Sequence, residues 1–361
     1  MEYKRLGDYI REVNARNRDE KVTNLQGVSI SKMFIPSIAN TIGTDMSTYK
    51  IVKPGQFAYG PVTSRNGDKV SIALYEESED AIISQAYTVF DIIDKDEVSN
   101  KYLMMWFQRP EFDRYARFHS HGSAREIFDW DELCNVMIPL PSIERQREIV
   151  EEYETLSRRI RLNEQMIEKL EATAQALYRK MFVDGIDKEN LPEGWRMGTL
   201  GEVATFKYGK LADKHPKCKE YPYPVFSGYA ITGYTNEYSL EEPTIVIIAR
   251  GDAGTGKICM SPQKCFLSNL AISIETKDKS IKEFLYYHLL ESDTMSLRSG
   301  SAQAQITINN IEPFEIMIPA RDICIDFSHK GKTLYKNMIL YKQENEKLTE
   351  LQSLLLAKMG Q

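Results

Sequence analysis

The sequence contains no run of about 18 consecutive apolar residues, the length that a membrane-spanning helix requires, so no membrane segment and no membrane partner are expected. Its first residues, Met1-Glu2-Tyr3-Lys4-Arg5, lack the apolar core of a secretory signal, and we expect a cytoplasmic protein. Only five of its 361 residues are cysteines, and none forms a CxxC pair. Reduced thiols are therefore expected, without disulfides or a cysteine-based zinc site.

Motifs that carry catalysis are also missing. The sequence has no Asn-Pro-Pro-Tyr methyltransferase motif, and no Asp/Glu-x-Lys nuclease core or Ser–His–Asp order stands out. In a chain long enough for two domains, this favours a binding protein over an enzyme. The net charge of −6 disfavours binding to the phosphates of nucleic acid. Any such binding must come from local basic stripes or from partner subunits.

The most informative feature that is present is a long repeat. The matching segments are Glu168-Lys169-Leu170 with Glu346-Lys347-Leu348, Lys180-Met181 with Lys358-Met359, and Gly122-Ser123-Ala124 with Gly300-Ser301-Ala302. The shift is constant, since 346 − 168 = 178 and 300 − 122 = 178. A period of this length predicts two copies of one globular unit, each followed by a long helix.

The repeat divides the chain into four blocks of an α+β protein. We expect a globular α/β domain over residues 1–142, a helix over 143–183, a second globular domain over 184–321 and a C-terminal helix over 322–361. Alternating or apolar runs predict strands at 70–75, 87–92, 136–139, 244–249 and 316–319. Helices are predicted at 101–118 and 281–290.

Both long helices carry an apolar seam at 4-3-4-3 spacing, which is the heptad pattern of a coiled coil. Its positions are Tyr153, Leu156, Ile160, Ile167, Leu170 and Leu177 in the first helix, and Leu334, Met338, Tyr341, Leu348 and Leu355 in the second. Each helix spans about forty residues, or roughly 60 Å, too long for its stripe to be covered by its own domain. Two separate amphipathic helices are one interpretation. An antiparallel coiled coil with the domains in a pseudo-twofold arrangement is favoured, because seams of matching length occur in one chain.

A glycine-rich segment, Gly251-Asp252-Ala253-Gly254-Thr255-Gly256-Lys257, nearly spells a phosphate-binding loop. That motif requires Ser or Thr after the lysine and then a helix, whereas Ile258 follows here and Pro262 opposes a helix. A glycine-rich hairpin is the better interpretation. A P-loop NTPase with a helical arm remains the alternative.

Basic and polar side chains gather on loops of both domains and are candidate nucleic-acid contacts, because Lys and Arg bind phosphates while Arg, Asn and Gln read base edges. In the first domain they are Arg65, Asn66, Arg114, Arg117, His119, His121, Ser123 and Arg125. In the second they are Lys207, Tyr208, Lys210, Lys214, Lys217, Lys219, Arg250, Lys257, Arg298, Ser301, Gln303 and Gln305. Solvated surface or turn capping is the ordinary alternative for each set. A two-histidine zinc site is the alternative for His119 and His121, although no further ligand stands in register.

In combination, these features resemble the specificity (S) subunit of type I restriction–modification systems. The segments that carry the resemblance are the doubled Gly-Ser-Ala, the apolar strands ending at Pro139 and Pro319, Ile143-Glu144-Arg145-Gln146 at the start of the first helix, the two helix endings, and Leu191-Pro192-Glu193-Gly194-Trp195 before Leu200-Gly201-Glu202. The resemblance covers essentially the whole chain. It departs from the family at residues 320–324, where a Pro-x-x-x-Gln segment is missing.

The resemblance implies a subunit without catalysis, cofactor or metal of its own. Each target-recognition domain would read one half of a split, asymmetric site in double-stranded DNA, and the helices would set the gap between the halves. Two modification (M) subunits using S-adenosylmethionine, and restriction (R) subunits using ATP and Mg²⁺, would be the partners. The DNA sequence itself is not predicted, because base-reading residues lie on variable loops.

Overall fold

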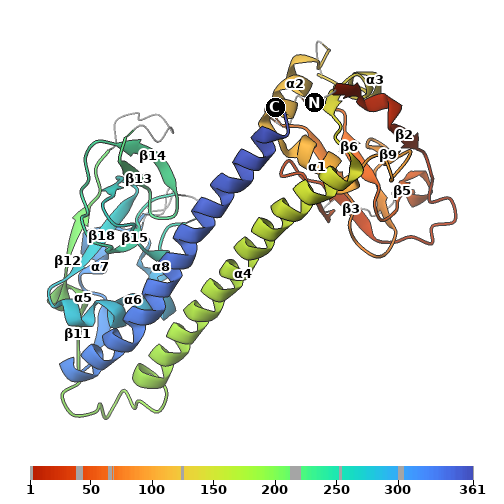
Figure 1. Ribbon diagram of the computed structural model, residues 1–361. Helices are drawn as coiled ribbons and strands as arrows, with labels where there is room; N and C mark the ends of the chain where they lie inside the picture. The colour runs from red at the N-terminus through yellow and green to blue at the C-terminus, as the bar shows by residue number, and fades with distance from the viewer. Residues whose placement is uncertain are drawn as a thin grey trace. The chain divides into compact units, whose positions relative to one another are not determined.

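The computed structural model describes residues 3–37, 44–63, 67, 69–122, 126–211, 221–251, 254–299 and 305–360. The chain forms two compact units, one from Met1–Asn163 with Gln343–Gln361 and the other from Glu164–Lys342. Each unit holds a globular domain of sheets and short helices together with parts of two long helices, α4 (Ile143–Phe182) and α8 (Arg321–Lys358) (Figure 1). The predicted α+β class with two globular domains and two long helices is confirmed.

The described residues of the first unit form three sheets. A short pair, β1 (Tyr3–Arg5) and β10 (Met137–Pro139), joins the start of the domain to the strand that precedes α4. The central sheet has the order β2-β9-β6-β7, with bounds Ile10–Val13, Thr88–Ile92, Phe57–Gly60 and Ser71–Leu74. The second sheet has the order β4-β3-β8-β5, with bounds Phe34–Pro36, Leu25–Val28, Ala81–Ile83 and Lys50–Val52.

The helices of the first unit correct one prediction. The expected single helix over 101–118 is two helices, α1 (Asn100–Gln108) and α2 (Pro110–Phe118). Arg109 between them is extended, with φ −68° and ψ 136°, because a residue before proline avoids the helical region. Pro110 then begins α2, where its missing N–H costs nothing. The remaining helical segments are α3 (Trp130–Cys134) and the 3₁₀ turns η1 (Leu6–Asp8) and η2 (Met46–Thr48).

The second unit repeats this topology. β11 (Arg196–Thr199) pairs with β19 (Glu315–Ile318), as β1 pairs with β10. Its central sheet has the order β12-β18-β15-β16, with bounds Ala204–Tyr208, Ala271–Thr276, Ile245–Ile248 and Ile258–Met260. A smaller sheet has the order β14-β13-β17, with bounds Ile231–Thr235, Tyr223–Phe226 and Phe266–Leu267. Helical segments are α5 (Leu200–Val203), η3 (Lys279–Ile281), α6 (Lys282–Glu291), η4 (Thr294–Leu297) and α7 (Ile308–Ile311).

The central sheets therefore correspond strand by strand: β2 to β12, β9 to β18, β6 to β15 and β7 to β16. This correspondence confirms the repeat. The predicted strands at 70–75, 87–92, 136–139, 244–249 and 316–319 are observed as β7, β9, β10, β15 and β19, and the predicted helix at 281–290 as α6.

A buried glutamine fixes the start of α4 in the first unit. Gln146 is fully buried, and its amide nitrogen donates to the carbonyl oxygens of Glu97 and Pro141, each at 2.9 Å. Its amide oxygen accepts from the backbone N–H of Ser99 at 2.9 Å. These bonds satisfy a buried polar side chain and tie α4 to the turn before α1.

The same position in the second helix is filled differently. Cys324 lies 178 residues after Gln146, at the place where the Pro-x-x-x-Gln segment is missing, and is fully buried with Phe327 in the core of the second unit. At this position a buried thiol replaces the buried amide and its three hydrogen bonds, while Arg321, the first residue of α8, donates to Asp278 at 2.9 Å on the surface. The end of α4 lies in the same core, where the Tyr178 hydroxyl and His288 Nδ1 form a hydrogen bond of 2.9 Å. Burial lowers the pKa of His288 to about 4, so its ring is neutral at pH 7.

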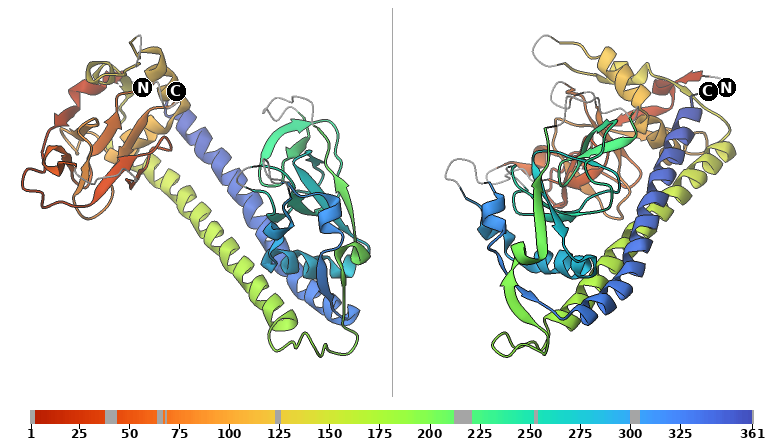
Figure 2. Two further views of the ribbon diagram at one scale, coloured as in Figure 1. Left: turned by 180° about the vertical axis from the view of Figure 1, so that it is seen from behind. Right: turned by 90° about the vertical axis from the view of Figure 1, so that its left-hand side faces the viewer.

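The two long helices pack antiparallel in each unit. In the first, Ser157 Oγ accepts from Gln352 at 2.7 Å and Asn163 donates to Asn345 at 2.8 Å, so the partner number falls as the α4 number rises. In the second, Glu171 faces Lys342 at 3.9 Å, and the Tyr178 and Phe327 rings lie 6.3 Å apart. Every predicted seam residue is buried or half-buried. Figure 2 shows the helices side by side in both views. No described helix is both long and apolar enough to cross a membrane.

Candidate nucleic-acid interface

The glycine-rich segment after β15 is the connection of an antiparallel hairpin. β15 pairs with β16, with Val246 opposite Cys259, and the N–H of Gly256 donates to the carbonyl of Ile248 at 2.9 Å. Gly256 has φ +92°, which favours glycine. Ile258 begins a strand where a phosphate-binding loop would begin a helix, so the P-loop alternative finds no support in the described residues.

Arg250 and Lys257 of this hairpin have no side-chain partner among the described residues. Arg250 and Lys257 are exposed, and their side chains make no hydrogen bond or ion pair with the described part of the chain. The backbone of Arg250 is held by a bond of 3.1 Å from its N–H to the carbonyl of Leu270. Both side chains are therefore free to meet a phosphate or a base edge.

The segment predicted as a lysine-rich loop at 207–210 begins inside a strand, because Lys207 and Tyr208 are the last residues of β12 and, of the three predicted contacts there, only Lys210 lies beyond it. Lys207 is paired with both carboxylate oxygens of Glu275, each at 3.1 Å, so its charge is largely balanced. The Tyr208 hydroxyl accepts from the backbone N–H of Ile308 at 3.1 Å, in the first turn of α7. Lys210 is exposed and is the one of the three that the described protein leaves unpaired.

The turn between Tyr208 and Lys210 admits only glycine. A Cβ on Gly209 would lie 2.0 Å from the carbonyl oxygen of Ser268, a backbone atom that cannot move aside. The N–H of Gly209 donates to the carbonyl of Ala271 at 3.0 Å. Close approach of two backbones therefore explains the glycine in this lysine-rich segment.

In the first unit, Arg114, His119 and His121 of the predicted basic cluster lie beside acidic side chains. Arg114 lies 3.0 Å from Glu111 on α2. His119 and His121 both approach the Glu132 carboxylate, at 3.3 Å and 3.7 Å. Among the described residues, no group of three His, Cys, Asp or Glu side chains is arranged to hold a metal ion, so the zinc alternative gains no support there.

Arg117 and Arg298, both predicted to contact DNA, form hydrogen bonds within the protein. Arg117 Nη1 donates to the carbonyl of Gly67 at 2.8 Å, and Arg298 Nε donates to the carbonyl of Thr255 at 3.0 Å. Gln305 forms a two-residue bridge with Ser299 through backbone bonds of 2.9 Å and 3.0 Å. The remaining predicted contacts lie outside the described residues: Arg65, Asn66, Ser123, Arg125, Lys214, Lys217, Lys219, Ser301 and Gln303.

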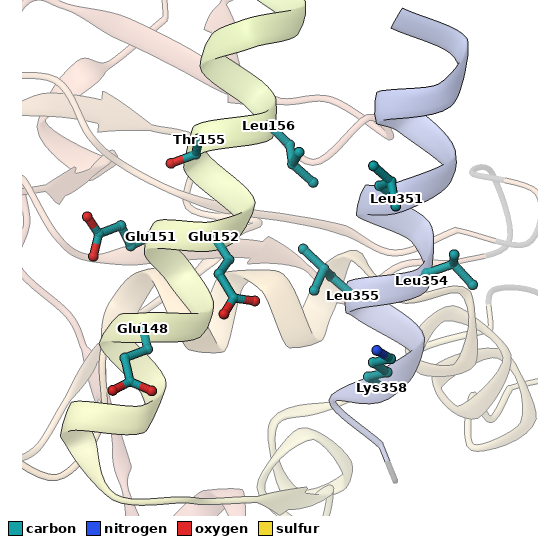
Figure 3. Close-up of a pocket in the computed structure, with 9 residues that line it drawn as sticks. All are labelled: Glu148, Glu151, Glu152, Thr155, Leu156, Leu351, Leu354, Leu355 and Lys358. Atoms are coloured by element: carbon teal, nitrogen blue, oxygen red, sulfur yellow. The ribbon is translucent and has the colours of Figure 1, made fainter. Parts of the chain in front are cut away.

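A groove lies between α4 and α8 in the first unit (Figure 3). It has a volume of about 720 Å³. Its lining residues are Glu148, Glu151, Glu152, Thr155 and Leu156 from α4, and Leu351, Leu354, Leu355 and Lys358 from α8. The leucines form its apolar part, and three glutamates line the α4 side.

Sequence reasoning missed the outer leucines of this groove. Leu351 is 49% exposed and Leu354 is 59% exposed, and neither belongs to the predicted seam. The run Leu354-Leu355-Leu356 could have indicated an exposed leucine, because three successive side chains cannot all face one side of a helix. Leu355 lies at the seam and Leu356 packs on the core of the first unit, which leaves Leu354 in solvent.

Comparison with known proteins identifies the class to which this fold and its repeated loops belong. Residues 35–172 and 192–354 match the family described as the type I restriction modification DNA specificity domain, once for each copy of the repeat. The two stretches cover most of the chain, and the chain belongs to this family.

Curated relatives and a solved structure agree with this assignment. The chain is 23% identical to the type I restriction enzyme MjaIX specificity subunit of Methanocaldococcus jannaschii, over 74% of this chain and 70% of that one. It is 20% identical to the HindI specificity subunit of Haemophilus influenzae, over 98% and 97%. The fold is similar to the crystal structure of a type I restriction–modification S subunit from M. genitalium, with a TM-score of 0.62 and 17% identity over 99% and 95%.

Proposed function

We propose that this chain is the specificity subunit of a type I restriction–modification complex, and that each globular domain reads one half of a bipartite, asymmetric DNA site. The observation that carries the proposal is the duplicated domain, in which the central sheets β2-β9-β6-β7 and β12-β18-β15-β16 have the same order. Two similar readers in one chain suit two separate half-sites. Joining them through paired helices makes their separation part of the specificity, as dimer spacing does for palindromic sites.

The chemistry is assigned to the partners. S-adenosylmethionine belongs to two M subunits, and ATP and Mg²⁺ belong to the R subunits, with no cofactor in this chain. The missing methyltransferase and nuclease motifs support this assignment, as does the strand that follows Lys257 where an NTPase would have a helix. With a net charge of −6, the chain alone should bind DNA weakly, and the M subunits should supply most of the phosphate contacts.

The groove between α4 and α8 is the docking surface that we assign to an M subunit. Its exposed leucines form an apolar strip that a partner helix can cover. Glu151 and Glu152 make no ion pair with the described residues, so the strip is flanked by unpaired negative charge. The matching surface is an amphipathic helix with basic residues beside its apolar face.

Replacing Leu354 with lysine should weaken the complex with the M subunit about tenfold or more. Leu354 is an exposed apolar side chain of the groove, and a lysine there would remove its apolar contact and repel the basic residues expected on the partner helix. Isothermal titration of M against the full chain measures the change. Leu162→Lys is the matched control, because Leu162 is 49% exposed on α4 of the same unit but does not line the groove. Equal weakening by both variants would contradict the assignment.

The DNA-reading role is tested by expressing the chain with its M subunits in a methylation-free host and sequencing the modified bases. One motif made of two short half-sites and an unread gap is expected. The chain alone should neither methylate nor cleave DNA nor hydrolyse ATP, because the chemistry lies in the partners. A single contiguous motif, or ATP hydrolysis that depends on Lys257, would overturn the proposal.

A further inference from the structure

In both units, a loop of the central sheet is held by a segment that follows it in the sequence. In each central sheet, a loop joins the third and fourth strands; its described residues are 61–63, 67 and 69–70 between β6 and β7, and 249–251 and 254–257 between β15 and β16. In each unit, a helical turn and an extended segment follow in the sequence and lie against that loop. These segments are 117–128 in the first unit and 294–306 in the second, counting only their described residues.

In the second unit, Arg298 and Thr294 hold the loop. Arg298 donates from both Nε and Nη2 to the carbonyl of Thr255, the Nε bond being 3.0 Å long. The Thr294 hydroxyl donates to the carbonyl of Gly256 at 2.5 Å, and Thr294 is only 6% exposed. The backbone adds a third tie, from the N–H of Ile306 to the carbonyl of Ala249 at 2.9 Å.

The first unit repeats the arrangement with different residues. Arg117 Nη1 donates to the carbonyl of Gly67 at 2.8 Å. The Thr63 hydroxyl, on a residue that is 2% exposed, lies 3.0 Å from Ser120 Oγ and 3.2 Å from the carbonyl of Glu126. The backbone tie runs from the N–H of Phe128 to the carbonyl of Pro61 at 2.8 Å.

We propose that Arg117 and Arg298 are positioning residues that join each hairpin loop to its facing segment, so that the two are presented to DNA as one surface. This inference rests on the proposed function. Both guanidinium groups donate N–H groups to backbone carbonyls. Those N–H groups are then not available to bind a guanine or a phosphate. Arg250 and Lys257, whose side chains are unpaired in the described chain, remain as contacts on the surface that Arg298 holds.

The packing of the second loop supports this coupling. A Cβ on Gly256 would lie 3.2 Å from both the Cα of Met295 and the carbonyl oxygen of Thr294. The loop and the η4 turn are therefore in direct backbone contact, with no room for a side chain at Gly256. Because no empty space separates the loop from η4, a movement of one is expected to displace the other.

The test uses Arg298→Ala and Thr294→Val in the full chain assembled with its M subunits. Methylation of a randomised DNA library gives the discrimination at every position of both half-sites. We expect both variants to lower discrimination about tenfold at two or more neighbouring positions of one half-site, while the other half-site and the gap stay unchanged. Thr294 is the decisive position, because its buried hydroxyl cannot touch DNA. Arg117→Ala and Thr63→Val should relax the other half-site in the same manner.

Arg321→Ala is the matched control in the second unit, because it removes an arginine bonded to Asp278 at 2.9 Å, away from the loop. It should leave both half-sites unchanged, and the melting temperatures of the loop variants should stay close to that of the wild type.

Relaxation at a single position by Arg298→Ala, with no effect of Thr294→Val, would make Arg298 a base reader. Uniform weakening with a shallower salt dependence would make it a phosphate contact, and unfolding of Arg298→Ala would make it a structural support. Each of these outcomes overturns the inference, whereas failure of the wild-type complex to yield any bipartite motif would overturn the proposed function.

Discussion

Replacing Phe182 with alanine is expected to lower the free energy of unfolding by about 3–5 kcal/mol, because it opens a cavity in a fully packed core. Phe182 is the last residue of α4 and has no exposed surface. Its ring lies 4.8 Å from that of Phe284 on α6, 5.2 Å from that of Phe327 on α8 and 5.9 Å from that of Trp195. One side chain thus joins both long helices to the second domain. Urea unfolding followed by circular dichroism measures the change.

Phe118→Ala is the control for this prediction. Phe118 is the last residue of α2 and is 82% exposed, so its removal should change the free energy of unfolding by no more than about 0.5 kcal/mol. Equal effects of the two substitutions would show that the aromatic cluster does not hold the end of α4.

Lengthening both long helices together is expected to lengthen the unread gap of the DNA site without changing either half-site. Seven residues inserted after Asn163 in α4, with seven more after Lys342 in α8, preserve the heptad seam because one full repeat is added to each side. Seven residues add about 10.5 Å of helix, which is comparable to about three base pairs. Methylation sequencing of DNA from cells that carry the variant and its M subunits measures the new gap.

A four-residue insertion in α4 alone provides the contrast. It moves α4 about one turn against α8 and mismatches pairs such as Asn163 with Asn345, so the gap should lengthen or recognition should be lost. Altered half-site bases with an unchanged gap, in the paired-insertion variant, would show that the helices do not set the spacing.

Much of the architecture was accessible from the sequence, because it depends on patterns that the chain repeats. The shift of 178 residues predicted two similar units, and the heptad spacing predicted the paired helices with their seam. Five strands and α6 were predicted because alternation and helical periodicity follow from local backbone geometry. The helix over 101–118 was wrong, although its own sequence contained the reason: Pro110 forces Arg109 out of the helical region.

The predicted nucleic-acid contacts show where sequence reasoning stops. Composition and spacing group Lys207, Arg250 and Arg298 together as cations on loops. The structure separates them: Lys207 is paired with Glu275, Arg298 is bonded to the carbonyl of Thr255, and Arg250 is unpaired among the described residues. A side chain's charge is visible in the sequence, whereas the partner that neutralises it is brought close only by folding.

By itself, the sequence determined the duplicated organisation, the two long helices and the family, because local periodicity and ordered motifs need no knowledge of long-range contacts. The tertiary structure alone decided three other features. They are the hydrogen bond that Arg298 makes across 43 residues of sequence, the burial of Cys324 where the other helix has Gln146, and the exposure of Leu354 beside the seam. Each depends on which distant segments meet, and that is set by the path of the whole chain through its sheets rather than by the spacing of neighbouring residues.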